Sequence, residues 1–275
     1  MITRRGLLGL MGAMAGTTLA GCAVASERRV ERIGVQLYTV RDLLSADVPG
    51  TLAAVAAAGY VEVETAGYAD LSPAAFKQEL AQAGLSAPSA HVPLDQIESS
   101  PQQLIEAAEQ VGHRYLVLPW LTPQQRATFD IYPRIADVMN EFGASCQEAG
   151  IQLAYHNHDF EFVPMDGKVP FDFLLERCDR ELVKFELDLY WAAKAGVDAV
   201  ALFQASPGRY PLCHVKDMSA DGAIVPVGDG TIDFASQFTA GVTGGLRHYF
   251  VEHDNPADPM ASIRRSIGTV RKLRF

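Results

Sequence analysis

The sequence predicts an α/β fold, a single (β/α)₈ barrel of the TIM-barrel type. Strand-like and helix-like segments alternate along the chain after residue 31, which favours a parallel sheet. Residues 32–275 have the length that is typical of one such barrel, and a hydrophobic content of 48% supplies a large core. No linker or low-complexity stretch interrupts these residues, so we expect one catalytic domain.

Short apolar runs that end in polar residues are expected to form the eight barrel strands. They are residues 33–38, 61–64, 86–91, 115–119, 151–156, 183–188, 211–216 and 248–253. Helical patterns lie between them, at residues 48–58, 73–83, 101–112, 130–149, 170–177, 198–204, 233–240 and 257–272. Start signals such as Ser72-Pro73 and following glycines such as Gly84 mark the ends of several helices.

The first residues have the pattern of an export signal. Two adjacent arginines precede a short apolar stretch, and Leu19-Ala20-Gly21-Cys22 matches a lipobox. The arrangement resembles a bacterial twin-arginine lipoprotein signal, and a plain secretory signal is the alternative. Gly and Thr interrupt the apolar stretch, which disfavours a permanent transmembrane helix. We expect a signal peptide at residues 1–21, lipidation of Cys22, a polar tether at residues 22–31, and an exported, periplasmic protein anchored to the membrane.

Charge and cysteine content narrow the function classes. The formal charge is -10, and loss of the two signal-peptide arginines would lower it to -12. An acidic body argues against nucleic acid as a partner and against a polybasic membrane patch, so the lipid is the expected membrane contact. The three remaining cysteines have no CxxC spacing and are expected to be small buried hydrophobes: Cys146, Cys178 and Cys213.

Four metal-ligand residues stand at the ends of four successive predicted strands. They are His156, Asp188, His214 and Glu252, spaced by about 30 residues, one strand-plus-helix unit. Because the carboxyl ends of barrel strands face one mouth, these side chains are expected to converge. Two imidazoles and two carboxylates suit Mn, Co, Zn or Fe(II), whereas Mg prefers oxygen ligands. We predict one divalent ion with part of its coordination sphere open to substrate.

Side-chain alternation along the strands suggests further catalytic residues. Lys216 shares a face with His214 and is a candidate for proton transfer or charge stabilisation, with an ion pair to Glu186 as the alternative. Glu186 lies one layer below Asp188 and is expected to support the ligands. His158, in the loop after the fifth strand, is a weaker candidate acid or base.

Other residues near strand ends are candidates for substrate binding. Aromatic faces beside hydrogen-bonding groups suit a sugar ring with apolar and hydroxylated sides. The candidates are Gln36, Tyr38, Glu64, His91, Trp120, Tyr190 and Trp191. The sequence has no GxGxxG after a strand and no GxSxG elbow, so neither a dinucleotide site nor serine hydrolase chemistry is indicated.

Six segments resemble the sugar phosphate isomerase/epimerase family, the xylose-isomerase-like TIM barrels. They are GVQLYTVRD (34–42), LAYHNHDFEF (153–162), FELDLYW (185–191), CHVKD (213–217), PVGDGTIDF (226–234) and YFVEHD (249–254), and the resemblance spans roughly residues 32–272. The family includes isomerases, epimerases, polyol dehydratases and an endonuclease branch. The resemblance implies a Glu, Asp, His, Glu metal site whose last three positions are Asp188, His214 and Glu252.

His156 occupies the first position of that site, which is a departure from the family pattern. In the epimerases, two ligand carboxylates move protons on opposite faces of the substrate. Replacement of one by histidine favours one-sided chemistry, either enolisation or β-elimination from a keto-sugar.

The leading hypothesis is a metal-dependent sugar isomerase/epimerase-like enzyme that removes a proton α to a carbonyl, with Glu252 or Lys216 as the base. Export favours an unphosphorylated sugar or keto-sugar, because free sugar phosphates are mainly cytoplasmic. The close alternative is a lyase or hydratase that eliminates an aglycone or water from a 3-keto-glycoside or keto-polyol. A non-catalytic carbohydrate-binding lipoprotein and a metal-dependent phosphodiesterase are further alternatives, and the acidic charge argues against the phosphodiesterase.

The lipobox predicts that Cys22→Ala releases the protein from membranes without harming its fold. An acyl chain contributes about 0.8 kcal/mol of membrane binding per buried CH₂, and the variant loses that contribution. Fractionation after detergent-free lysis measures the distribution of both proteins. A wild-type chain found wholly in the soluble fraction would contradict the prediction.

Overall fold

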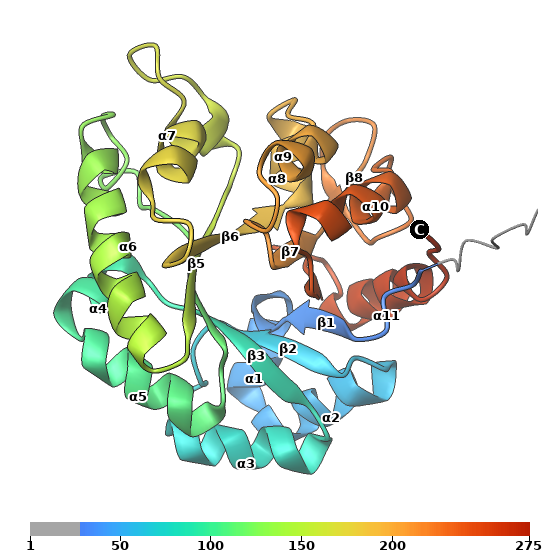
Figure 1. The fold of residues 1–275 in the computed structure, drawn as a ribbon. Helices are drawn as coiled ribbons and strands as arrows, with labels where there is room; N and C mark the ends of the chain where they lie inside the picture. Colours follow the sequence, from blue (N-terminus) through green and yellow to red (C-terminus); the bar gives the residue numbers. More distant parts are fainter. Residues whose placement is uncertain (1–27) are drawn as a thin grey trace, which may run out of the picture.

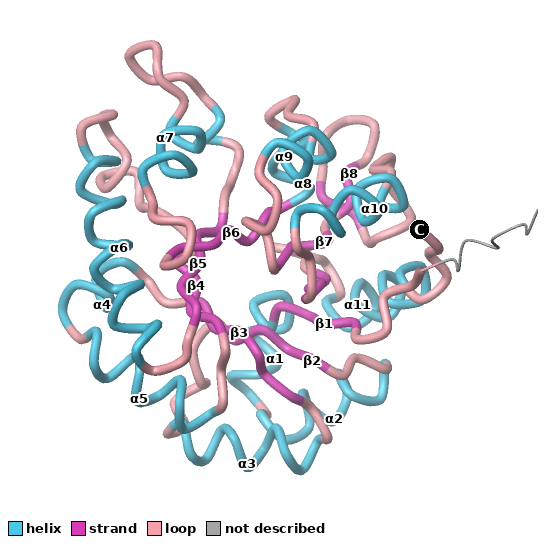
Figure 2. Tube along the Cα trace, viewed as in Figure 1, coloured by secondary structure: helices cyan, strands magenta, loops and turns pink. Residues whose placement is uncertain are grey.

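The computed structural model describes residues 28–275, which form a closed barrel of eight parallel strands surrounded by helices (Figures 1 and 2). Around the barrel the strand order is β1-β10-β7-β6-β5-β4-β3-β2. The barrel strands are β1 (Ile33–Gln36), β2 (Glu62–Thr65), β3 (Ser86–His91), β4 (Tyr115–Leu118), β5 (Gln152–His156), β6 (Val183–Asp188), β7 (Leu212–Val215) and β10 (His248–Val251). The predicted (β/α)₈ barrel is thereby confirmed. The predicted signal peptide and Cys22 lie outside the described residues.

The eight predicted helices are present in the outer layer. They are α2 (Val48–Ala58), α3 (Pro73–Ala83), α5 (Pro101–Val111), α6 (Ile131–Glu148), α7 (Pro170–Arg177), α9 (Ala199–Ala205), α10 (Phe234–Gly244) and α11 (Pro259–Val270). Local signals fix several ends. The Ser72 side chain accepts a hydrogen bond from the Ala75 N–H at the start of α3, and Gly84 ends that helix in a left-handed conformation (φ 70°).

Short elements that the sequence analysis did not predict follow several strands. They are η1 (Leu37–Val40), α1 (Arg41–Ala46), α4 (Leu94–Ser99), η2 (Phe160–Phe162), α8 (Leu189–Lys194) and the hairpin strands β8 (Asp217–Met218) and β9 (Ile224–Val225). They shorten predicted strands: the strand expected over 33–38 ends at Gln36, whose side-chain oxygen accepts the Tyr38 N–H and starts a 3₁₀ turn. These turns build the rim of the barrel mouth.

An apolar cluster fills the barrel interior beneath the mouth. It consists of Tyr115, Val117, Ala154, Leu212 and Phe250. Ala154, Leu212 and Phe250 each precede a predicted ligand by two residues, so the expected alternation of inward-facing side chains is confirmed. This floor excludes water from below, and the polar groups above it therefore lie in a medium of low dielectric constant.

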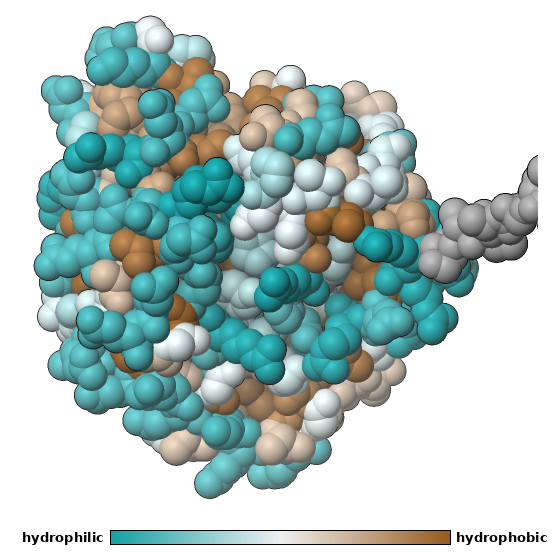
Figure 3. All heavy atoms as spheres, viewed as in Figure 1, coloured by the Kyte–Doolittle hydropathy of each residue, from teal (hydrophilic) through white to brown (hydrophobic). Residues whose placement is uncertain are grey.

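The outer surface is mostly hydrophilic on the face shown in Figure 3, with small, scattered hydrophobic patches. Within residues 28–275, no helix is both long and apolar enough to cross a membrane. Cys146, Cys178 and Cys213 are buried and unpaired, as predicted.

A buried carboxyl group fixes the loop after β5. The Tyr155 hydroxyl donates to Oε1 of Glu161 (2.6 Å), and the backbone N–H of His158 donates to Oε2 (2.7 Å). Glu161 has no exposed surface, and burial raises its pKa to about 7. The carboxyl group therefore links the end of β5 to the loop that carries His158.

The raised pKa predicts that Glu161→Gln stabilises the protein at alkaline pH. Because the folded-state pKa of about 7 lies above the ordinary 4.5, the contribution of Glu161 is complete below pH 4.5 and is lost as the pH rises through 7. Two to three pKa units correspond to about 3 kcal/mol. Glutamine can accept from the His158 N–H and donate to Tyr155. We expect a higher melting temperature than wild type at pH 8 and no difference at pH 4.5.

The matched control is Glu148→Gln, which removes an exposed carboxylate from the same half of the barrel. Its melting temperature should follow that of the wild type at both pH values. An equal alkaline gain in both variants would mean that the general charge balance, not the buried carboxyl group, is responsible.

A candidate metal centre at the barrel mouth

The four predicted metal ligands converge at the carboxyl ends of four strands. His156 and Asp188 end β5 and β6, His214 lies in β7, and Glu252 follows β10. One donor atom from each lies within 4.8 Å of the other three, and all four residues are buried. Asp188 and His214 are register partners on adjacent strands, which accounts for their proximity. The four strand-end side chains thus form a compact set of two nitrogen and two oxygen donors.

The hydrogen bond of His156 fixes which ring nitrogen can bind a cation. Nδ1 lies 2.9 Å from the Pro119 carbonyl oxygen, which can only accept, so Nδ1 carries the proton. Burial and the neighbouring His214 lower the pKa of His156, and the ring is neutral. The lone pair of Nε2 then faces Oδ2 of Asp188 at 3.3 Å. Two lone pairs in this arrangement call for a cation between them, so these residues fit a metal.

His214 presents each ring nitrogen to a different pair of carboxylates. Nδ1 lies 2.7 Å from Glu252 and 3.6 Å from Asp188, whereas Nε2 lies 2.7 Å from Glu64. Among the described residues, Nδ1 has no partner in hydrogen-bonding geometry, although Glu252 is in contact. Nδ1 therefore faces the cation position while Glu64 holds Nε2, and a carboxylate behind a ligating imidazole orients the ring.

Lys216 is a buried cation between three carboxylates. Its Nζ lies 2.7 Å from Oε2 of Glu252, 3.0 Å from Oδ2 of Asp188 and 2.7 Å from Oδ1 of Asp254. Burial lowers the pKa of Lys216, but Asp188 and Glu252 raise it well above its ordinary value. The alternative ion pair with Glu186 is wrong. Glu186 lies level with Leu212, which is two residues before His214 and four before Lys216, and so it lies deeper in the barrel than Lys216.

The two remaining catalytic candidates differ in their charge. Burial raises the pKa of Glu252, but Lys216, His214 and His156 together lower it well below its ordinary value, so Glu252 is an ionised carboxylate. Burial, His156 and Lys216 lower the pKa of His158 to about 2. His158 is neutral, and its ring stacks on Phe160 with the ring centres 5.4 Å apart.

A cavity of about 590 Å³ lies above this cluster. Its walls contain the predicted ligands His156 and Glu252, the catalytic candidates Lys216 and His158, and the substrate-binding candidates Tyr38, His91 and Trp120. Tyr38 and Trp120 are 42% and 41% exposed, which leaves their rings accessible. Asp254 and Asn255 also line the cavity. The sequence analysis did not select them, although alternation beyond Glu252 places Asp254 on the inward face.

Four predicted substrate-binding residues lie outside the cavity wall. Gln36 and Glu64 are fully buried below it, where the Gln36 amide donates to Glu64 (2.8 Å). Tyr190 is buried and its hydroxyl donates to the Gly222 carbonyl (2.9 Å), while Trp191 packs beside His158. The chain turns into α8 at Leu189, which directs Tyr190 toward Gly222 and packs Trp191 against His158, whereas Gln36 and Glu64 lie within strands β1 and β2.

The chain is similar to several curated proteins. It is 29% identical to the inosose dehydratase of Geobacillus kaustophilus over 132 residues, which are 42% of each protein. The inosose dehydratase of Clostridium perfringens is 27% identical over 122 residues, 38% of this chain and 40% of that protein. The chain thus aligns with less than half the length of these curated relatives.

Solved structures match over nearly the whole chain. A sugar phosphate isomerase/epimerase from Parabacteroides distasonis is 25% identical, with a TM-score of 0.76 over 90% of this chain and 96% of that structure. The zinc-bound IOLI protein has a TM-score of 0.67 at 16% identity, over 86% of this chain and 96% of that protein, which shows a shared fold.

The family comparison covers most of the barrel. Residues 52–269 match the family described as xylose isomerase-like TIM barrel. This agrees with the closed parallel barrel and with the cluster of donor atoms at its mouth. The chain therefore belongs to the xylose isomerase-like TIM barrel family.

Proposed function

We propose that this protein is a metal-dependent lyase that removes a proton α to the carbonyl of an unphosphorylated keto-sugar or keto-polyol and expels a β substituent. The proposal rests on a difference between two residues of the donor set. Glu252 is an ionised carboxylate in the cavity wall, whereas the position on β5 is a neutral His156 held by Pro119. One carboxylate base suits elimination, in which a proton leaves from one face only. The dehydratase names of the curated relatives agree with this reaction class.

The described residues can complete the proton balance of an elimination. A divalent cation held by His156, Asp188, His214 and Glu252 would act as a Lewis acid on the substrate carbonyl. The α C–H bond breaks with the proton passing to Glu252, a C=C bond forms, and the β C–O bond breaks. The leaving oxygen takes a proton from Lys216. Transfer between Glu252 and Lys216, whose charged atoms are 2.7 Å apart, restores both groups.

The cavity wall supports an uncharged carbohydrate as substrate. Among the described residues that line it, Lys216 is the one Lys or Arg, and three carboxylates already surround its ammonium group. A phosphate group would meet Glu252 and Asp254 without a free cationic partner. The exposed rings of Tyr38 and Trp120 suit the apolar faces of a sugar.

Isomerisation or epimerisation is the second candidate. The Parabacteroides distasonis structure, a sugar phosphate isomerase/epimerase, matches 90% of this chain and favours it. An enzyme of this class could use Glu252 alone to move a proton between adjacent carbons. Epimerisation with bases on both faces fits less well, because the neutral His156 ring donates from Nδ1 to Pro119 and its Nε2 faces the cation position.

Export and lipid anchoring remain part of the proposal. They rest on the twin-arginine and lipobox patterns, which lie outside the described residues. A periplasmic site of action would agree with a substrate that carries no phosphate.

Reaction in deuterated water distinguishes the candidate functions. We expect the full-length, metal-loaded protein to convert a keto-glycoside or keto-polyol into an unsaturated product that has lost its β substituent. Glu252→Gln should lower the rate by at least roughly 10²–10⁴, because the variant lacks both the positioned base and a charged ligand of the cation. Mass spectrometry and NMR of the products provide the measurement. A product of unchanged composition that carries deuterium at one carbon would support isomerisation instead, and binding without turnover would support a carbohydrate-binding protein.

Lys216→Met tests the proton donor. With metal bound, the variant should keep its metal and lose roughly 10²–10⁴ in turnover. Without metal it should be less stable by about 3–5 kcal/mol, because three carboxylates lose their cation. Thermal melts with and without metal, metal content and rates are measured on one preparation. Lys194→Met, an exposed lysine on α8, is the control. Wild-type turnover in a folded, metal-loaded Lys216→Met protein would remove Lys216 from the mechanism.

A further inference from the structure

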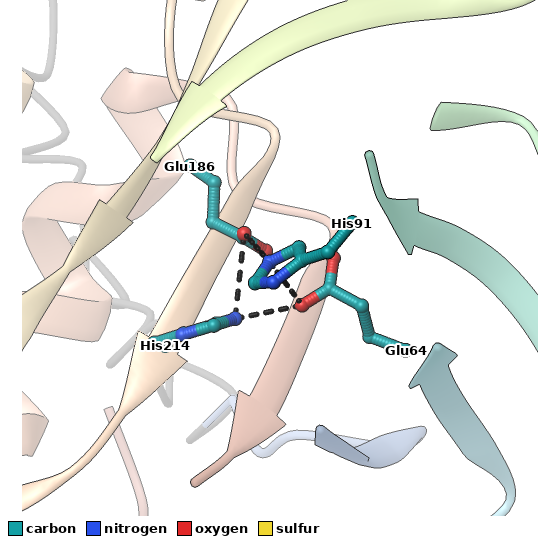
Figure 4. A group of neighbouring side chains, drawn as sticks. All are labelled: Glu64, His91, Glu186 and His214. Atoms are coloured by element: carbon teal, nitrogen blue, oxygen red, sulfur yellow. Dashed lines mark hydrogen bonds and ion pairs between the residues drawn. The ribbon is translucent and has the colours of Figure 1, made fainter. Parts of the chain in front are cut away.

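A second group of potential ligands lies one layer below the first, inside the barrel. It consists of Glu64 on β2, His91 on β3, Glu186 on β6 and His214 on β7, and their side chains point toward one another (Figure 4). The Glu64, Glu186 and His214 side chains have no exposed surface, and that of His91 is 11% exposed. We propose that this group is a second binding site for a divalent cation of the zinc type.

The distances within this group are those of ion pairs, equal to or shorter than the ligand–ligand distances of a tetrahedral metal site. Nε2 of His91 lies 3.0 Å from Oε2 of Glu64 and 3.1 Å from Oε2 of Glu186. Nε2 of His214 lies 2.7 Å and 3.3 Å from the same two oxygens. A tetrahedral ion with bonds of about 2.0–2.2 Å holds its ligand atoms roughly 3.3–3.6 Å apart. Small outward movements of the side chains would therefore admit the ion.

Glu186 supplies an independent sign of a missing partner. Its Oε1 atom is fully buried and has no hydrogen-bond partner among the described residues. A buried carboxylate oxygen without a partner is costly, whereas an ion can bind both oxygens of one carboxylate. Two carboxylates would also neutralise the two charges of the ion, so the site adds no net charge to the barrel interior.

The site has both an entry path and enough ligands of its own. His91 lines the cavity, so an ion that enters the mouth reaches the second group beside its ring. Glu64, His91 and Glu186 belong to this group alone, and three protein ligands suffice for an open zinc site. His214 lies between the two sites, with Nδ1 toward the first and Nε2 toward this one. It can bind both ions only as an imidazolate that has lost its ring proton, and otherwise its Nε2–H donates to Glu64 while the other three residues hold the second ion.

Metal counting on the full-length protein tests the proposal without relying on activity. The protein is stripped with a chelator, reloaded with Zn²⁺ or Co²⁺, dialysed, and analysed for ions per chain and for the visible absorption of tetrahedral Co²⁺. We expect two ions in the wild type and one each in His91→Ala and His156→Ala. The control His113→Ala should keep two, because His113 is a buried histidine that bonds to Ala87 and Tyr68. If His91→Ala does not fold, Glu186→Gln replaces it with the same expected count.

The outcomes separate this site from the one on which the proposed function depends. One ion in both the wild type and His91→Ala, lost in His156→Ala, would overturn the second site and leave the first. One ion that is lost in His91→Ala and kept in His156→Ala would support the second site and overturn the first. No bound ion in the wild type would overturn both, and the second group would then be a network of protonated histidines and carboxylates.

Discussion

The buried His214 ring is the element on which the rest of the centre depends. Its two nitrogens face Glu252 and Glu64, which themselves contact Lys216 and His91. Buried charges are tolerated only when each has a partner in good geometry. The orientation of this one ring therefore links the upper donor set, which faces the cavity, to the lower set within the barrel, and a change in either set is felt by the other.

Two features of the barrel allow this many charged groups to lie buried close together. Strand alternation sends a side chain inward at every second residue, so apolar residues such as Ala154 and Leu212 lie directly beneath polar ones. The parallel register then brings the polar positions of neighbouring strands to the same level, as for Asp188 and His214. A dry floor below and a cavity above leave the cluster open from one side, the side from which substrate would approach.

The proposed chemistry rests on the asymmetry of the upper donor set. His156 is neutral and tied to the Pro119 carbonyl, whereas Glu252 is ionised and touches the ammonium group of Lys216. A base and an acid in contact on one side of the cavity suit a reaction that takes a proton from carbon and returns it to a leaving oxygen. The negative charge of the wall and the exposed rim aromatics are consistent with a neutral sugar or polyol.

The sequence alone determined the barrel, because alternating segments and strand-end spacing are local properties that closure preserves. It also placed His156, Asp188, His214, Glu252 and Lys216 at one mouth, since each follows from the inward alternation of its own strand. Only the tertiary structure decided which groups meet across the barrel. Glu64 and His91 contact Glu186 and His214, which joins β2 and β3 to β6 and β7. The spacing of the strands along the sequence does not predict contacts between side chains on opposite sides of the barrel. The positions of the Gln36 and Tyr190 side chains outside the cavity wall likewise depended on where the chain leaves β1 and β6. A cap or turn at the end of a strand changes the direction of the side chain.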